Sequence, residues 1–305
     1  MFQFFTLFIF FFCTNCVYSL YLSLNSSYNS NLSFQSYFAI CAIVRDEPDL
    51  LEWVEYHKQM GCNKFYLTDN GLKSSIDILL KSYIEDGMVV LTTNNQRGQQ
   101  LHSYNSCLEK HRASHRWIAF IDADEFIVTK DYCNIPSILV HYEKFGGVVM
   151  QWMIIGSSGH TKRPEGGILK NYWKCARNAG SKSIVNTNFV KSHAGNPHSF
   201  RYKTGNFAVF TDFKQVNSTW NPPYVELYQI MYLNHYHFKS KEDYDRNRKR
   251  GRADYRDEVA PAHYKTDHYF EVNNAYCKRN CSILQIPKVS ARFCEKSFIF
   301  QKKTV

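Results

Sequence analysis

The chain has 305 residues, of which 44% are hydrophobic and 21% charged, so it can bury a sizeable core and is not an intrinsically disordered protein. Lys and Arg total 37 against 27 Asp and Glu, and the resulting net charge of +10 favours anionic partners such as nucleic acid, anionic lipid or phosphorylated small molecules. No nucleic-acid reading motif accompanies that charge, so we expect no nucleic-acid partner.

The first 22 residues, "MFQFFTLFIFFFCTNCVYSLYL", have the character of a targeting segment. They carry no charged side chain and contain an apolar run as long as a signal-peptide core. Val17 and Ser19 suit a cleavage site, whereas the missing basic residues leave an uncleaved anchor open. We expect a protein of the Golgi or ER lumen, secreted or anchored by one span, that meets the membrane only here. A buried N-terminal strand is disfavoured by the Asn/Ser-rich linker at 23–37.

Glycosylation sequons and cysteines suit the same compartment. The sequons are at Asn25, Asn31 and Asn217, with a weaker one at Asn280. Of ten cysteines, eight remain if Cys13 and Cys16 leave with the targeting segment, an even number compatible with disulfides. Cys277 and Cys281 are candidates for a local disulfide, with two unpaired thiols as the alternative.

From residue 38 onward, short β-rich runs alternate with helical patterns. The predicted strands are 38–44, 64–68, 88–92, 116–121 and 148–155, and the predicted helices are 46–61, 74–87, 98–112 and 135–147. The first run, "FAICAIV", is too continuously apolar for a half-exposed strand. The sequence therefore predicts an α/β fold with a doubly wound, mostly parallel sheet and helices on both faces.

The composition changes after residue 155. Gly, His, Asn and Lys dominate "GSSGHTKRPEGG" and "KSHAGNPHSFRYKTGN", which indicate loops around short strands such as "FAVFT". A basic helix then ends at Gly251. We expect a catalytic domain at 38–260, divided into a ligand-binding half at 38–155 and a loop-rich half at 156–260. Residues 261–305 form a C-terminal extension with no clear period.

Three carboxylates stand in the apolar run "FIDADEF" at the end of a predicted strand. Asp122, Asp124 and Glu125 repel one another in a low-dielectric site unless a cation offsets their charge. Oxygen ligands favour Mg²⁺ or Mn²⁺, which substrate phosphates commonly complete. An acidic turn capping the next helix is the alternative, and it explains one Asp more easily than three carboxylates.

Polar residues follow other strands of the predicted sheet as well. The carboxyl ends of parallel strands meet at one edge, so Arg45–Glu47 and Asp69–Asn70 face the same crevice as the carboxylates. No glycine-rich phosphate loop follows any strand, so a bound diphosphate needs the cation and basic side chains. "NHYHFKS" supplies His235, His237 and Lys239, whereas most of the following Lys and Arg residues suit a solvated helix face.

An ordered string of motifs resembles glycosyltransferase family 92, the DUF23 type, and related GT2-like enzymes. The motifs are "CAIVRDE", "EWVEYH", "KFYLTDN", "WIAFIDADEF", "GSSGH", "KSIV" and "LNHYHFKSKEDYDRNRKRG", spread over about residues 38–255. The resemblance implies a GT-A fold, a nucleotide-sugar donor and a metal held by the DxD motif. It places Asp122 on the nucleotide side and Asp124 on the metal, with His235 and then His237 as the C-terminal metal ligand.

The predicted donor-binding and metal residues combine that resemblance with the polar residues noted at the strand ends and in "NHYHFKS". Both DxD aspartates are predicted metal ligands together with the two histidines, and Mn²⁺ or Mg²⁺ is the predicted cofactor. Predicted donor-binding residues are Arg45, Glu47, Asp69, Asn70, Asp122 and Lys239. The resemblance does not identify which residue is the catalytic base. The candidates, each more often structural than catalytic, are Glu165, Asp212 and His160.

The leading interpretation is a metal-dependent transferase that moves a hexose such as galactose from a UDP-linked donor to a glycan or glycoprotein hydroxyl, with inversion. A non-catalytic glycan-binding protein is one alternative. A haloacid-dehalogenase-like phosphatase is another, although Phe126 stands where such enzymes carry Thr or Val.

Overall fold

The computed structural model describes residues 36–71, 75–130, 133–217, 219, 230–251 and 266–281. The predicted targeting segment at 1–22, most of the linker and the sequons Asn25 and Asn31 lie outside these residues. None of the described helices is long and apolar enough to span a membrane.

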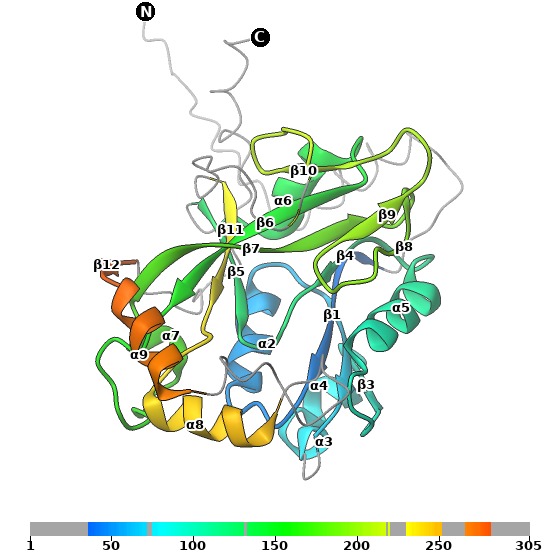
Figure 1. The fold of residues 1–305 in the computed structure, drawn as a ribbon. Helices are drawn as coiled ribbons and strands as arrows, with labels where there is room; N and C mark the ends of the chain where they lie inside the picture. The colour runs from blue at the N-terminus through cyan, green and yellow to red at the C-terminus, as the bar shows by residue number, and fades with distance from the viewer. Residues whose placement is uncertain are drawn as a thin grey trace, which may run out of the picture. The chain divides into compact units, whose positions relative to one another are not determined.

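The first half follows the predicted alternation of strands and helices (Figure 1). Its elements are β1 Ser36–Val44, α2 Leu50–Gln59, β2 Lys64–Asp69, α3 Ile76–Leu79, α4 Lys81–Glu85, β3 Val89–Thr93, α5 Gln100–His111 and β4 His115–Phe120. Strands β3, β2, β1 and β4 are adjacent in that order and all parallel. The predicted helix at 74–87 is two short helices that meet at Leu80.

The second half extends the same sheet. Its elements are β5 Glu125–Thr129, α6 Ile135–Leu139, η2 Val140–Tyr142, β6 Gly147–Ile155, α7 Ile168–Asn171, β7 Lys174–Asn186, β8 Val190–His193, β9 Phe200–Tyr202, β10 Ala208–Phe210, β11 Met231–His235, α8 Lys241–Arg250, α9 Asp267–Tyr276 and β12 Arg279–Asn280. The main sheet has the order β3-β2-β1-β4-β7-β6-β11-β5, with β10 on β6 and β12 on β7. The predicted α/β class with a mostly parallel sheet is confirmed.

The second half differs from expectation in two places, because no strand was predicted at 174–186 and the segment 191–206 was predicted as a loop. Strand β7, which has 13 residues, lies in the middle of the sheet between β4 and β6. The segment 191–206, expected to be a loop, contributes β9 and most of β8, which pair antiparallel as a separate sheet. Lys, Arg, Asn and Ser occur irregularly throughout "KCARNAGSKSIVN". Strand β7 therefore lacks the continuous apolar run by which a central strand is recognised.

Helices cover both faces of the first half of the sheet. Along β1, Phe38, Ile40, Ala42 and Val44 join the core beneath α2, whereas the intervening residues pack toward α5 in a second core. This double burial explains why "FAICAIV" has no polar positions.

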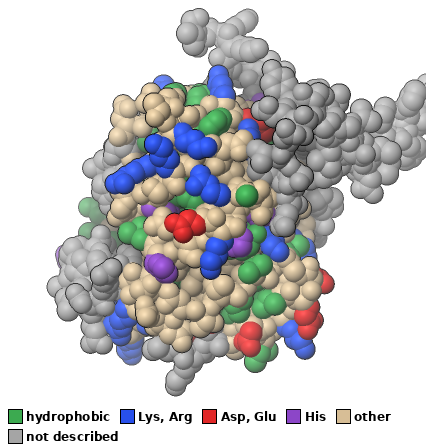
Figure 2. All heavy atoms as spheres, turned by 90° about the vertical axis from the view of Figure 1, so that its right-hand side faces the viewer, with side chains coloured by type: hydrophobic (Ala, Val, Ile, Leu, Met, Phe, Trp, Pro, Cys, Tyr) green, Lys and Arg blue, Asp and Glu red, His purple; other side chains and the backbone are tan. Residues whose placement is uncertain are grey.

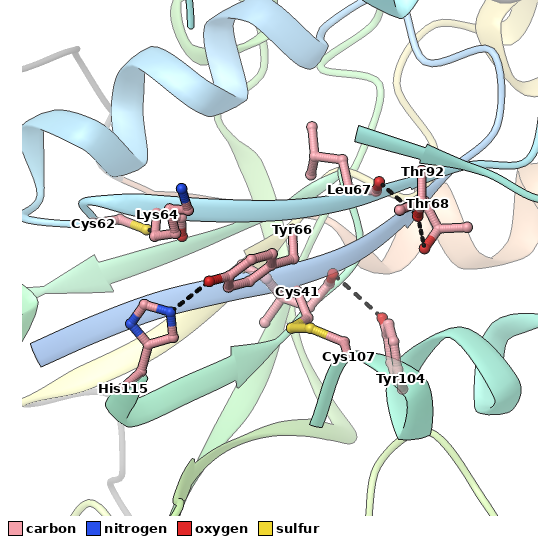
Figure 3. The surroundings of a disulfide bond; sticks show 11 residues. Cys41, Cys62, Lys64, Tyr66, Leu67, Thr68, Thr92, Tyr104, Cys107 and His115 are labelled. Carbon is pink, nitrogen blue, oxygen red and sulfur yellow. Dashed lines mark hydrogen bonds between the residues drawn. A yellow bond between two sulfur atoms is a disulfide. The ribbon is translucent and has the colours of Figure 1, made fainter. Parts of the chain in front are cut away.

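Among the residues that the structure describes, two disulfides join positions far apart in the sequence. Cys41 of β1 pairs with Cys107 of α5, near the hydrogen bond between Tyr66 and His115 (Figure 3). Cys175 of β7 pairs with Cys281. The candidate disulfide between Cys277 and Cys281 was therefore wrong, and so was the alternative of two unpaired thiols, because Cys281 pairs with Cys175 while Cys277 is a buried free thiol.

The described surface reflects the positive net charge. Figure 2 shows the side of the molecule that carries α5, β8 and β9, where Lys and Arg side chains outnumber acidic ones. Exposed cations in this region include Lys110, Lys191, Arg201 and Lys203.

Candidate active site

A tight turn between β4 and β5 carries the three carboxylates. The Glu125 amide donates to the carbonyl of Asp122 (3.0 Å), and the Asp122 amide donates to Oε2 of Glu125 (2.8 Å). Strand β5 then runs antiparallel to β11, with Glu125 opposite His235 in the register. The sheet therefore brings the "DADE" turn together with the "NHYH" segment, more than a hundred residues later.

Asp124, His235 and His237 form a group suited to hold a metal ion. Each offers one ligand atom, and these atoms lie within 4.8 Å of one another. Nε2 of His235 is 3.6 Å from Oδ2 of Asp124. Burial opposes charge on both residues, yet their mutual attraction lowers the pKa of Asp124 and raises the pKa of His235. One carboxylate and two imidazoles suit Mn²⁺ better than Mg²⁺, which prefers oxygen ligands alone.

Asp122 lies next to this group but is not part of it. Its Oδ1 accepts hydrogen bonds from Gln100 Nε2 (2.7 Å) and the Tyr104 hydroxyl (3.0 Å), and its Oδ2 accepts one from Lys182 Nζ (2.9 Å). Burial opposes ionisation of Asp122, but Lys182 lowers its pKa overall. The structure thus separates the two aspartates that the sequence grouped as metal ligands.

Glu125 lies fully buried next to the metal-suited group formed by Asp124, His235 and His237. Burial, together with Asp122 and Asp124, raises the pKa of Glu125 to about 8 even though Lys182 opposes the shift. Its Oε1 is 4.0 Å from Nδ1 of His235, and neither atom has a hydrogen-bond partner within the described part of the chain. A carboxylate in this position can orient the imidazole of a metal ligand.

A cavity of about 460 Å³ opens over these residues. Arg45, Glu47, Gln100 and Arg250 line it near the end of β1, and Trp152, Ile154, Ala176 and Arg177 line it along β6 and β7. The metal-suited group, Asp122 and Lys182 also belong to its lining. The volume suits a small-molecule ligand that contacts both halves of the sheet.

Only some of the predicted donor-binding residues reach this cavity. Arg45 and Glu47 do, whereas Asp69 and Asn70 do not, although Asn70 Oδ1 accepts from Nη1 of Arg45 (2.9 Å) and so positions it. Lys239 is 1% exposed and lies outside the lining. Its ammonium group is 2.6 Å from Glu47 Oε1 and 2.6 Å from Asp49 Oδ2, so it acts within a buried ion network.

The three candidate bases also lie outside the cavity lining. Glu165 is exposed on the loop before α7. Asp212 pairs with Lys214 (2.9 Å) just after β10, and Nε2 of His160 lies 3.1 Å from the carbonyl oxygen of Asn171. The structure does not bring any of them together with the metal-suited group.

Sequence reasoning missed the partners of the first aspartate. Lys182 opens the motif "KSIV", but its role depends on the pairing of β7 with β4, which the composition of β7 concealed. Gln100 and Tyr104 are spaced i, i+4 on α5, so they present one helical face to the strand end. That spacing is the signal by which they could have been found.

Comparison of this chain with known proteins identifies the same family that its sequence motifs resemble. The family model described as glycosyltransferase family 92 matches residues 36–267, and the chain belongs to this family. A family 92 protein of Oryza sativa subsp. japonica is 26% identical over 175 residues, which cover 54% of this chain and 30% of that protein. A second, from Ricinus communis, is 25% identical over 210 residues, covering 66% of this chain and 35% of that protein. The chain thus spans about a third of the length of these relatives.

Two further similarities are narrower. A galactan beta-1,4-galactosyltransferase of Arabidopsis thaliana is 28% identical over 116 residues, which cover 35% of this chain and 22% of that protein. Among solved structures, TarS of S. aureus aligns over 50% of this chain and 28% of its own, with a TM-score of 0.34 and 15% identity.

Proposed function

We propose that this protein is a metal-dependent glycosyltransferase that moves a hexose from a UDP-linked sugar to a glycan or glycoprotein hydroxyl, with inversion at the anomeric carbon. The observation that carries the proposal is the convergence of Asp124, His235 and His237 in the lining of the 460 Å³ cavity. Family membership supports the reaction class. Galactose is the first donor sugar to test, because the Arabidopsis relative is named a galactosyltransferase.

The metal-suited group fits Mn²⁺, which would supply positive charge for the departing diphosphate when bound. Around it, the chain contributes its own cations to the cavity. Arg45 is held toward the end of β1 by Asn70, and Arg250 donates to the carbonyl of Asp46 (3.2 Å) beside it. These two guanidinium groups mark the side of the cavity where we place the nucleotide. Lys182 keeps Asp122 ionised and fixed at the edge of the same space.

A secretory location remains part of the proposal. Two disulfides among the described residues suit an oxidising compartment, where such bonds persist. The targeting segment proposed at residues 1–22 would deliver the chain there.

The test is a donor screen with UDP-Gal, UDP-Glc, UDP-GlcNAc and GDP-sugars, each with and without Mn²⁺. We expect one preferred UDP-sugar, dependence on the metal, and loss of turnover in Asp124→Asn. The control is Asp77→Asn, an exposed aspartate on α3 that does not line the cavity. Full turnover of Asp124→Asn would refute the metal-dependent mechanism, and NMR of the product anomer tests inversion.

The same samples separate the alternatives. Absence of UDP binding by calorimetry in the presence of Mn²⁺ would favour a non-catalytic glycan-binding protein. A haloacid-dehalogenase-like phosphatase needs a carboxylate nucleophile, and both oxygens of Asp122 already accept hydrogen bonds. Hydrolysis of a general phosphomonoester would nevertheless overturn the transferase proposal.

A further inference from the structure

Helix α9 forms one wall of the cavity although it begins where the family match ends. The match covers residues 36–267, and α9 spans Asp267–Tyr276. Tyr269, Asn273 and Tyr276 line the cavity, followed by Cys277. Their i, i+4, i+7 spacing places the three side chains on one face of the helix. The predicted C-terminal extension thus contributes side chains to the lining of the cavity.

Several contacts hold α9 in this position. Beyond its C-terminal end, the Cys175–Cys281 disulfide and the pairing of β12 with β7 tie the chain to the main sheet. Oδ1 of Asn274 accepts a hydrogen bond from the amide of Ser157 (2.7 Å). Phe270 packs on Tyr244 of α8, with ring centroids 5.0 Å apart, and α8 and α9 lie side by side in Figure 1. The wall is therefore fixed to both β7 and α8.

The wall packs against strands β6 and β7 and not against β1, where Arg45 follows the strand end. Cys277 contacts the carbonyl of Ile154, and the small core around α9 contains Ile154 with Ala176 packed against it, which are residues of β6 and β7. Strands β7 and β6 are separated from β1 by β4. The ring of Tyr269 lies 6.4 Å from that of His237. One end of the wall therefore adjoins the place where the bond to the sugar would break.

The chemistry of this face suits a sugar. Tyr276 is 68% exposed although it lines the cavity, and Tyr269 is half-buried. The electron-rich faces of aromatic rings attract the weakly positive C–H groups of a pyranose, and the Asn273 amide between them can both donate and accept hydrogen bonds. The two tyrosines are about 10 Å apart along the helix axis, which suits an oligosaccharide better than a monosaccharide. No residue among the three carries charge, so the face suits a neutral glycan.

We propose that Tyr269, Asn273 and Tyr276 of α9 form the acceptor-binding wall, on which pyranose rings of a neutral oligosaccharide stack. This inference rests on the proposed transferase function and adds the position and chemical class of its acceptor. It also gives the Cys175–Cys281 disulfide a function, because the disulfide holds the wall in place.

The test measures glycan binding directly, so it does not depend on turnover. A neutral biantennary N-glycan, cellotetraose and a heparin tetrasaccharide are titrated into the full chain in the presence of UDP and Mn²⁺. We expect a neutral probe to bind, and Tyr276→Ala and Tyr269→Ala each to weaken it about threefold to tenfold. Tyr276→Trp should retain binding. The matched control is Val272→Ala, which truncates a 37% exposed side chain on the same helix outside the cavity lining.

The outcomes are decisive in both directions. Binding of the neutral probe that is equal in Tyr276→Ala, Tyr269→Ala and Val272→Ala would overturn the inference, as would binding of heparin alone or of none of the three probes. UDP affinity is measured in parallel by calorimetry and should be unchanged in every α9 variant. If the wild-type chain binds no UDP, the proposed function is contradicted. If only the tyrosine variants lose UDP affinity, α9 binds the nucleotide and not the acceptor, and the inference is overturned.

Discussion

Nζ of Lys182 lies 2.9 Å from Oδ2 of Asp122, and this ion pair joins the middle strand β7 to the acidic turn after β4. The same nitrogen is 3.9 Å from Oε2 of Glu125. Lys182 is fully buried, so the structure answers the charge of the first aspartate with a fixed protein cation. The second aspartate is left to His235 and His237. We therefore expect one metal ion, at Asp124 and the two histidines, and none bound by Asp122.

Replacing Lys182 with Met should destabilise the fold, because Asp122 would lose its counter-charge. Breaking a buried ion pair costs about 3–5 kcal/mol. Roughly a third of the Asp122 side chain is exposed, and solvent screening reduces the expected loss to about 2 kcal/mol. Urea unfolding at pH 7 measures it. Lys191→Met, on an exposed position of β8, is the control and should change stability by less than about 0.5 kcal/mol. Equal stability of the two variants would show that Asp122 needs no cation.

Glu125→Gln should weaken metal binding without unfolding the protein. A glutamine can still accept the hydrogen bond from the Asp122 amide, but it cannot offer a second carboxylate oxygen to Nδ1 of His235, 4.0 Å away. Loss of such a partner typically costs about 10–100-fold in metal affinity. Calorimetric titration with Mn²⁺ measures the change, with Glu109→Gln on the exposed face of α5 as the control. Unchanged Mn²⁺ affinity would mean that Glu125 does not orient His235.

The parts of the site that the sequence predicted are those that local pattern determines. The apolar run of β4 gives way to the carboxylates of "DAD" just after the strand ends, and the histidines stand out in an otherwise basic and aromatic segment. The register of β5 with β11, which brings His235 opposite Glu125, is not readable locally. It depends on which strands pair, and strand order in a mixed sheet is a global property.

Lys239 is a residue that the sequence placed at the donor but that the structure places in a buried ion network. Next to two histidines it resembled a phosphate-binding cation, but its backbone takes a positive φ of 50°, and its side chain ends between Glu47 and Asp49. Those carboxylates lie about 190 residues earlier in the sequence. Neither residue type nor spacing shows that a buried cation already has two partners. Lys182 was missed for the same reason, since its partner Asp122 lies in the turn after a different strand, β4.

The buried network around Lys239 predicts a specific acid sensitivity. Burial disfavours charge on Asp49, but Lys239 and Arg163 outweigh it and lower the pKa of Asp49 from 3.8 to about 2. Because the folded pKa is the lower one, the stabilisation is fully present above about pH 4 and is lost as the pH falls toward 2. It amounts to about 2 kcal/mol. Asp49→Asn should therefore flatten the dependence of unfolding free energy on pH between 4 and 2.

The control for this measurement is again Asp77→Asn, whose carboxylate is exposed. Its pH profile should parallel that of the unaltered chain. If Asp49→Asn showed the same slope as Asp77→Asn between pH 4 and 2, the ion network would not contribute to acid stability.

Gly180 of β7 lies so close to the indole of Trp152 that there is no room for a side chain at position 180. A Cβ added to Gly180 would lie 1.8 Å from Cε3 of Trp152, whose ring centroid is 4.6 Å from that of His235. Gly180→Ala must therefore displace the indole, and overpacking of this kind costs about 1–3 kcal/mol. Because the indole packs on a metal-suited histidine, Mn²⁺ affinity should fall as well.

The substitution Trp152→Leu in the Gly180→Ala background removes the indole that the new Cβ displaces, so it should recover part of the lost stability. A double-mutant cycle by urea unfolding measures this coupling. Strictly additive effects of the two substitutions would show that Gly180 is not required for the indole to pack against His235.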